Sequence, residues 1–329
     1  MLFLYIIIGL SVLFDLLNGI RDAGNFVSTL ISTHVFRRHT ALIVSAVAEF
    51  VGPLVFGTAV ARAFEEKLVA REQMTLQVIG AALLAAILWN LITLWLSIPS
   101  SSTHSLVGGI FGAVIAAGGM AALQTEGIFS ILLSLFLSPL LGIAAGYLMT
   151  LLFYYLARDA TPNVNGVFMA LQVPFSVLLA TSYGANDAQK TMAMITLGLI
   201  ATGQLDSFDV PTWVILVSAG ATALGILLSD QRLVHKLGSK FFRLKPIHGS
   251  GAEAGASIIL LGSSLLGYPA SSSQVITSAI LGSGAADRVN KVRWGTAWPI
   301  LQAWLIAIPV SMGLAAGCYW LLGKLGFLF

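Results

Sequence analysis

Long apolar runs constrain the fold of this chain more than any other feature of its sequence. Runs such as 76–97 and 128–157 carry no charge, and they are as long as or longer than the about 20 residues that a helix needs to cross a bilayer. Only 9% of the 329 residues are charged, against roughly 25% in soluble domains, so a water-soluble surface is excluded. The runs are continuously apolar, whereas the strands of a membrane β-barrel alternate. The sequence therefore predicts an all-α polytopic membrane protein.

Ten membrane segments joined by short loops are expected. Three of them, 2–33, 98–119 and 167–202, contain polar residues that predict an interruption of the helix. The other segments are 40–60, 76–97, 128–157, 211–228, 253–268, 269–284 and 294–323. Charged residues gather in two of the connecting loops, 62–75 and 230–251.

Basic residues gather on one side of this arrangement. If the segments alternate in direction, the loops 34–40, 158–166, 230–251 and 285–293 share a side, and they hold most of the Lys and Arg residues. Because basic loops face the cytoplasm, we expect a multi-pass protein of a bacterial or archaeal cell membrane with both termini outside. The basic loop 230–251 is then cytoplasmic. The net charge of +3 is too small to indicate a nucleic-acid partner.

Two polar motifs occur twice, in the same order. The stretch "NGIRDAGN" at 18–25 resembles "YGANDAQK" at 183–190, and "PSSSTHSLVGGIFGA" at 99–113 resembles "PASSSQVITSAILGS" at 269–283. Chance similarity between segments rich in small residues is the alternative. It is disfavoured because Asp and Pro also recur and the two motifs keep their spacing.

The repeat predicts two halves of opposite orientation. The halves 1–160 and 161–329 hold five expected segments each, and an odd number makes the second half enter the membrane from the other side. Inverted repeats with interrupted helices are typical of secondary transporters whose site lies near the bilayer midplane. We therefore expect two inverted-topology transmembrane repeats.

Five carboxylates fall inside the expected segments. They are Asp15, Asp22, Glu49, Asp187 and Glu253. A charge near the bilayer centre costs at least ~2.5 kcal/mol, so such residues pair, face water or titrate. Asp22 and Asp187 are the strongest functional candidates because they lie in the repeated motifs. Glu49 and Glu253 fit a functional role and a buried structural role equally well.

Two basic residues, Arg21 and Lys190, also fall inside expected segments. They could pair with the carboxylates or bind an anion. Lys190 follows Asp187 by three residues, a spacing that puts both on one helix face. A structural ion pair remains the alternative for Lys190.

Each serine-rich motif predicts a helix start. Ser and Thr are favoured N-cap residues, and a helix N-terminus offers unpaired N–H groups and a positive dipole end to an anion. Two such starts could face each other at mid-depth. The alternative is that the hydroxyls bond to nearby carbonyls and only kink a helix. Two copies in register favour an anion site formed by Ser101, Ser102, Thr103, Ser271, Ser272 and Ser273.

An enzyme is disfavoured. His104 with a serine and an intramembrane Asp could form a hydrolase triad, but the second motif has Gln274 at the matching position. The single cysteine, Cys318, excludes a cysteine-based metal cluster. No cofactor and no resident metal site are expected.

The motifs together resemble a known family. "FDLLNGIRDAGNFVST", "PSSSTHSLVGG", "GANDAQKTM" and "PASSSQVITSAILGSGAADRVNKVRWGTAW" are similar to the inorganic phosphate transporter (PiT) family of sodium- or proton-coupled permeases, nearly end to end. The resemblance implies a symporter, a homodimer, and two re-entrant-type helical hairpins whose tips hold phosphate. It implies that the six hydroxyl residues bind phosphate. The residues implied in coupling or substrate binding are Asp22, Asn25, Asn186 and Asp187.

Three positions depart from the family pattern. Arg21 stands where members often carry Asn or His, and Gln274 ends a motif that usually reads Ser-Thr-Thr-His. Lys190 matches Asn25 of the first motif, and an ammonium cannot ligate sodium but can replace its charge. This is similar to the proton-coupled bacterial branch, which is thought to carry phosphate with a divalent metal ion.

Proton coupling is therefore expected rather than sodium coupling. The alternatives are a sodium-coupled phosphate symporter and a permease for sulfate or another oxyanion. Lys190 is also expected to act in coupling or substrate binding. Residues with a possible role are Arg21, His104, Gln274, Glu253 and Asp15.

Overall fold

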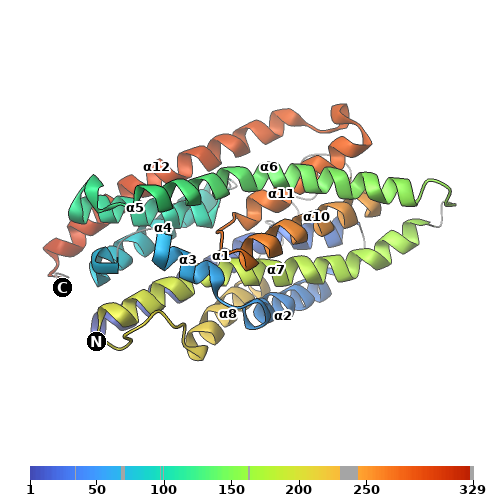
Figure 1. Ribbon diagram of the computed structural model, residues 1–329. Coiled ribbons are helices and arrows are strands. Elements are labelled where there is room, and N and C mark those ends of the chain that lie inside the picture. Colours follow the sequence, from blue (N-terminus) through green and yellow to red (C-terminus); the bar gives the residue numbers. More distant parts are fainter. Residues whose placement is uncertain are drawn as a thin grey trace.

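Long helices lie side by side along one axis of the molecule, and both chain termini lie at the same end (Figure 1). We call this the terminal end. The computed structural model describes residues 1–33, 35–67, 71–96, 98, 100–161, 164–229 and 244–326, and this part of the chain contains helices and no strands. The predicted all-α class is confirmed.

The helices differ in length. Their bounds are α1 Leu2–Ser32, α2 Arg38–Phe56, α3 Ala59–Lys67, α4 Leu76–Trp95, α5 Ser102–Gly118, α6 Thr125–Leu156, α7 Val164–Ala201, α8 Thr212–Leu227, α10 Pro246–Leu265, α11 Ser272–Asp287 and α12 Trp294–Lys324, with short 3-10 turns η1 Arg71–Gln73, η2 Met120–Ala122 and η3 Val289–Lys291. Within the described residues, α1, α2, α4, α6, α7 and α12 are long and apolar enough to cross a membrane.

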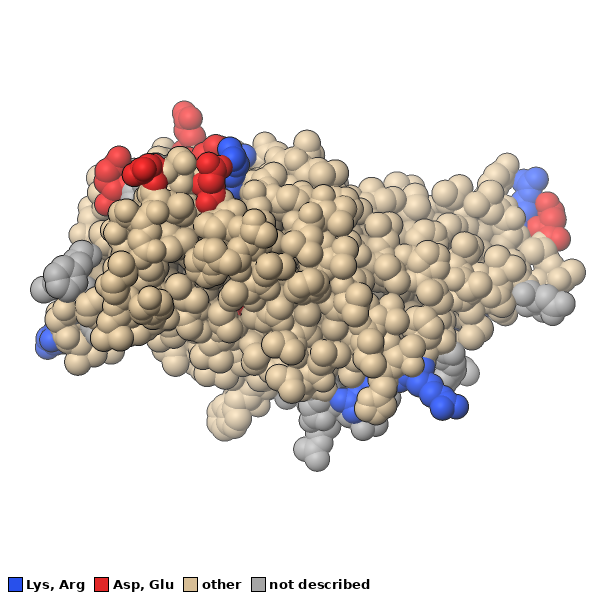
Figure 2. All heavy atoms as spheres, turned by 90° about the horizontal axis from the view of Figure 1, so that it is seen from below, with Lys and Arg blue, Asp and Glu red and all other residues tan. Residues whose placement is uncertain are grey.

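The outer surface of the bundle is apolar. On α6, for example, Phe129 is 69% exposed and Leu140 is 62% exposed. Figure 2 shows a broad face that is almost free of charged side chains, with Lys, Arg, Asp and Glu at its margins. Such a face is stable against lipid tails or against another apolar protein surface.

Two of the three predicted interruptions are wrong. Helix α1 is continuous from Leu2 to Ser32, and α7 is continuous from Val164 to Ala201. The polar residues in these helices bond to side chains on neighbouring helices, so their backbones keep the intrahelical hydrogen bonds that a bilayer requires. The third predicted interruption, in 98–119, is a genuine turn between α4 and α5.

The predicted loop 230–251 also ends earlier than expected. Helix α10 begins at Pro246, the favoured first helical position for proline. Gly249 and Gly251 are buried in its first turns because they pack closely against Gln172 and Thr150. Residues 230–243 lie outside the described part of the chain, as do Pro99 and His34.

Glycines let the helices that carry the Asp motifs approach their neighbours closely. A methyl group at Gly184 of α7 would overlap the carbonyl oxygen of Glu49 on α2, and one at Gly19 of α1 would overlap the carbonyl oxygen of Thr222 on α8. Both glycines are the paired positions of the repeated motif. Their role is therefore close packing inside an intact helix.

Replacing Gly184 with alanine is expected to destabilise the protein by about 1–3 kcal/mol, since the helices must separate to admit the methyl group. The measurement is the thermal unfolding midpoint in detergent. The control is Gly220→Ala on α8, where an added methyl group meets no atom within 4 Å. Equal midpoints for both variants would contradict the close-packing role.

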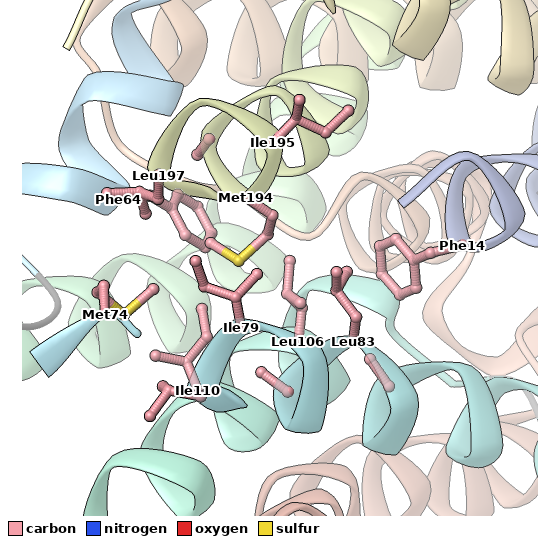
Figure 3. Packing of buried hydrophobic residues seen from close by; sticks show 14 of the residues in the cluster. Phe14, Phe64, Met74, Ile79, Leu83, Leu106, Ile110, Met194, Ile195 and Leu197 are labelled. Atoms are coloured by element: carbon pink, nitrogen blue, oxygen red, sulfur yellow. The ribbon is translucent and has the colours of Figure 1, made fainter. Parts of the chain in front are cut away.

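The two largest of the three apolar clusters in the described residues hold most of the helices together, and the polar motifs lie between these two. The first includes Phe14 of α1 and Met194 of α7, packed with α3, α4 and α5 (Figure 3). The second includes Ala23 of α1 and Tyr183 of α7, packed with α2, α10 and α11. Both Asp motifs thus sit at the boundary of the clusters, where buried polar groups must satisfy one another.

Candidate functional site

Two helical hairpins meet at their tips inside the bundle. Helices α4 and α5 form the first hairpin, on the side of the terminal end, and α10 and α11 form the second, on the other side (Figure 1). Ser101 is the N-cap of α5 and Ser271 is the N-cap of α11. Their Oγ atoms lie 2.7 Å apart. The two predicted helix starts therefore converge on one point.

The first tip is held by local hydrogen bonds. The Oγ of Ser101 accepts from the backbone N–H of His104 at 3.2 Å and lies 2.8 Å from His104 Nδ1. The hydroxyl of Thr103 donates to the carbonyl of Ala270 in the second tip at 3.2 Å. Trp89 of α4 donates its indole N–H to Ser100 Oγ at 2.8 Å. All these hydroxyls are buried.

The Asp motif of α7 binds both tips. Asn186 Nδ2 donates to the carbonyl of Ala270 and to Ser272 Oγ, each at 2.8 Å. The buried ammonium of Lys190 donates to Thr103 Oγ1 at 2.8 Å and to the carboxylate of Asp187. Lys190 thus forms the ion pair that its spacing allowed, and it also contacts a proposed phosphate ligand.

The Asp motif of α1 lies beside α4. Asn25 donates to Asp22 Oδ1 at 3.1 Å, and Arg21 Nε is 3.8 Å from the same oxygen. Arg21 Nη1 donates to Asn90 Oδ1 at 2.8 Å. The Nε and Nη2 atoms of Arg21 are buried and make no hydrogen bond within the described residues. They leave two donors for an anion.

Asp15 and Glu253 belong to separate hydrogen-bonded groups. Asp15 accepts from Thr191 of α7 at 2.6 Å, one residue after Lys190. Glu253 of α10 belongs to a different hydrogen-bonded group. Its partners are Thr29, Gln172 and Ser176.

The matching positions of the two serine-rich motifs lie side by side. Gln274 Nε2 is 3.4 Å from both ring nitrogens of His104. Both residues line a cavity of about 590 Å³ that also contacts α6 and α12. His104 also contacts the hydroxyl cluster through Ser101. Of the six proposed hydroxyl ligands, Ser273 is only half-buried.

Three polar contacts were not expected from the sequence. Asn90 bridges Arg21 and Asn18, Thr191 binds Asp15, and Gln189 binds the start of α3. A lone Asn inside the apolar run of α4 is a signal that could have drawn attention to Asn90. Nothing in the sequence indicated the partner of Gln189.

Comparisons with known proteins bear on the family and the fold of this chain. A family model described as "Phosphate transporter family" matches residues 18–315. A "Probable low-affinity inorganic phosphate transporter" of Rhizobium meliloti (strain 1021) is 40% identical over 95% of this chain and 94% of its own, and the one of Bacillus subtilis (strain 168) is 37% identical over 95% of each. A solved structure titled "The sodium-dependent phosphate transporter" has a TM-score of 0.89 at 21% identity, over 98% of this chain and 100% of that one.

Proposed function

The chain belongs to the phosphate transporter family of the cell membrane, and we propose that it is a symporter that moves inorganic phosphate by alternating access. The family's members are transporters rather than enzymes. The observation that carries the proposal is the convergence of two helix N-termini, whose N-cap residues Ser101 and Ser271 touch through their hydroxyls. Two such ends in one buried place form an anion site.

Phosphate enters between the tips by replacing their mutual contact. The hydroxyls of Ser101 and Ser271 bond to each other, and each can donate to a phosphate oxygen instead. The other proposed ligands are Ser102, Thr103, Ser272 and Ser273. Arg21 adds its two open donors from the α1 side. Charge-assisted hydrogen bonds of this kind are roughly twice as strong as neutral ones.

The charges around the site favour a companion cation for phosphate. Asp15, Asp22, Glu49 and Asp187 are buried near two cations, Arg21 and Lys190. A phosphate dianion would add negative charge to this buried group. A proton on Asp22 or Asp187, or a divalent metal ion carried with phosphate, offsets the charge.

Lys190 favours protons over sodium as the coupling ion. A sodium-dependent phosphate transporter has this fold, but in this chain an ammonium already neutralises Asp187. Because the ammonium of Lys190 already balances this carboxylate, the binding of a sodium ion there is less favourable. We propose that Asp22 accepts the coupling proton, or Asp187 once its ion pair with Lys190 opens.

The two halves work as inverted repeats in this proposal. The hairpins extend from the meeting point toward opposite ends of the molecule (Figure 1), as two re-entrant hairpins from opposite membrane faces would. The halves are 1–160 and 161–329, the terminal end faces outside, and the working unit is a homodimer.

Uptake of labelled phosphate into proteoliposomes tests the coupling. An inward proton gradient is expected to drive accumulation, and a sodium gradient alone is expected to drive none. Asp22→Asn and Asp187→Asn are each expected to abolish accumulation, because an amide does not take up a proton at neutral pH. Accumulation under sodium alone would overturn proton coupling.

Two further arms of the assay test the substrate. Excess sulfate is expected to compete poorly, since sulfate carries no proton near neutral pH and cannot donate to a carboxylate. Removal of divalent metal ions with a chelator is expected to lower uptake, because the metal ion carried with phosphate offsets the negative charge of the anion. Strong competition by sulfate would favour a general oxyanion permease.

A further inference from the structure

The side chain of Gln189 supplies the N-cap of a helix on another part of the chain. Its Oε1 accepts from the backbone N–H groups of Val60 at 2.7 Å and Ala61 at 3.1 Å. These are the second and third residues of α3, the positions that an N-cap side chain serves. The carbonyl of Thr58, the residue before α3, accepts from Arg62 at 3.1 Å. Gln189 therefore completes a cap that begins at Thr58.

Gln189 is also part of the site motif on α7. It stands next to Lys190, which binds Asp187 and Thr103. Its own Nε2 donates to the carbonyl of Ala185, which fixes the orientation of the amide. The side chain is fully buried. One rigid side chain thus joins the site helix to α3.

Helix α3 lies against the turn of the second hairpin. Its first residue, Ala59, places a carbonyl against Gly267, where an added methyl group would be 3.1 Å from the oxygen. Its last residue, Lys67, lies over the ring of Tyr268 at 4.3 Å. Gly267 and Tyr268 directly precede the serine-rich tip. The stretch 62–75, expected to be a charged loop, therefore begins with a helix that covers this turn.

The two faces of α3 have different surroundings. Val60, Ala61 and Phe64 are buried in the first apolar cluster, where Phe64 lies near Met194 and Leu197 (Figure 3). The opposite face is exposed, with Arg62 paired to Asp209 at 3.1 Å. The helix thus covers part of the first apolar cluster and presents charged side chains on its outer face.

Helix α3 depends on its external contacts. Its nine residues are fewer than an isolated helix needs to be stable in water. It is joined to α2 through Gly57, whose φ of +77° is a conformation that glycine adopts readily. A short helix on a glycine link moves as a unit when its cap is released.

We infer that Gln189 is a positioning residue that holds α3 over the second hairpin, and that α3 is the cover through which the site opens to the terminal end. The inference rests on the proposed transport function. A shift of α7 that moves Lys190 also moves Gln189 and withdraws the cap from α3. Rearrangement at the substrate site is thereby linked to opening of the cover.

The test measures how readily a water-soluble thiol reagent reaches a cysteine at Val60. The parent carries Cys318→Ala, which removes the single native cysteine, and Val60→Cys. In Gln189→Met, which keeps the length but has no acceptor oxygen, labelling is expected to speed up by roughly two- to thirtyfold, the population change that loss of an N-cap produces. As a carboxylic acid, the side chain of Gln189→Glu keeps the acceptor oxygen and a donor toward the carbonyl of Ala185, and it is expected to restore slow labelling.

A second reporter separates opening of α3 from general unfolding. Ala219→Cys on α8 is fully buried outside α3, and it is expected to stay protected in all three backgrounds. In uptake assays Gln189→Met is expected to lower the maximal rate without raising the KM for phosphate, because the phosphate ligands are untouched. Gln189→Glu is expected to recover that rate.

The outcomes distinguish the inference from the function on which it rests. Slow labelling of Val60→Cys in Gln189→Met, or equally fast labelling in Gln189→Met and Gln189→Glu, would overturn the role of the Gln189 oxygen. A raised KM with an unchanged maximal rate would place Gln189 in substrate binding and also overturn it. The labelling needs no transport, so absent phosphate uptake in the parent would contradict only the proposed function.

Discussion

Replacing Lys190 with methionine is expected to abolish phosphate uptake and to destabilise the folded protein by about 3–5 kcal/mol, the range for breaking a buried ion pair. The ammonium of Lys190 is 0% exposed and pairs with Asp187. Methionine fills the space of the stem but leaves a buried carboxylate without its counter-charge. The contact with Thr103 at the first tip is lost as well. Uptake in proteoliposomes and thermal unfolding in detergent measure the two effects.

A double variant separates the charge from the fold. Asp187→Asn with Lys190→Met is expected to recover most of the lost stability, since neither buried group is then charged. Uptake is expected to stay absent, because the carboxylate proposed for coupling and the fixed cation are both gone. Normal uptake by Lys190→Met alone would contradict a role for the fixed charge of Lys190 in transport.

A surface ion pair provides the matched control. Lys291 donates to Asp287 at 2.7 Å at the exposed end of α11, and this hydrogen bond holds the pKa of Asp287 below its usual value. Lys291→Met removes the same charge with the same substitution. The change in stability is expected to stay within about 1 kcal/mol, because exposed pairs are well screened. Uptake is expected to be normal.

Replacing Asn186 with leucine is expected to reduce uptake at least tenfold and to cost about 1–3 kcal/mol of stability, the penalty for buried polar groups left unsatisfied. Asn186 is the link between α7 and the second tip, since it bonds to the carbonyl of Ala270 and to Ser272. Without it, the start of α11 is no longer held opposite Ser101. The KM for phosphate is expected to rise, because Ser272 is a proposed ligand.

The control for this substitution lies on the same helix. Asn165 is exposed in the first turn of α7, so Asn165→Leu makes the same chemical change where water can satisfy neighbouring groups. It is expected to leave KM and stability unchanged. If Asn186→Leu transported phosphate with the parental KM, the hydrogen bonds from Asn186 to the second tip would not contribute to phosphate binding.

The membrane class and the two helix starts at the serine-rich motifs were accessible from sequence because both depend on local patterns. An uncharged run such as 128–157 can be stable only in lipid, whatever its neighbours are. The serine-rich motifs predict helix starts because Ser and Thr are favoured N-cap residues. Ser101 and Ser271 are the N-cap residues of α5 and α11. The recurrence of the motifs indicated that the two starts belong together, and the structure brings them to 2.7 Å.

Sequence reasoning failed where a polar residue finds its partner on a distant helix. The residues of the Asp motifs suggested breaks in 2–33 and 167–202, yet α1 and α7 are continuous. A polar side chain in an apolar run is compatible with a broken helix and with an intact one. Partners such as Thr191 for Asp15, 176 residues away, decide between them.

The sequence by itself determined that this protein lies in a membrane, that it is helical, and that two serine-rich motifs begin helices. These properties follow from composition and from interactions within a few residues. Only the tertiary structure decided that Lys190 neutralises Asp187 while it holds Thr103, that Arg21 keeps two open donors, and that Gln189 caps α3. Those contacts depend on the distance between packed helices. The helices around Gly184 are so close that a single added methyl group would overlap a neighbouring backbone.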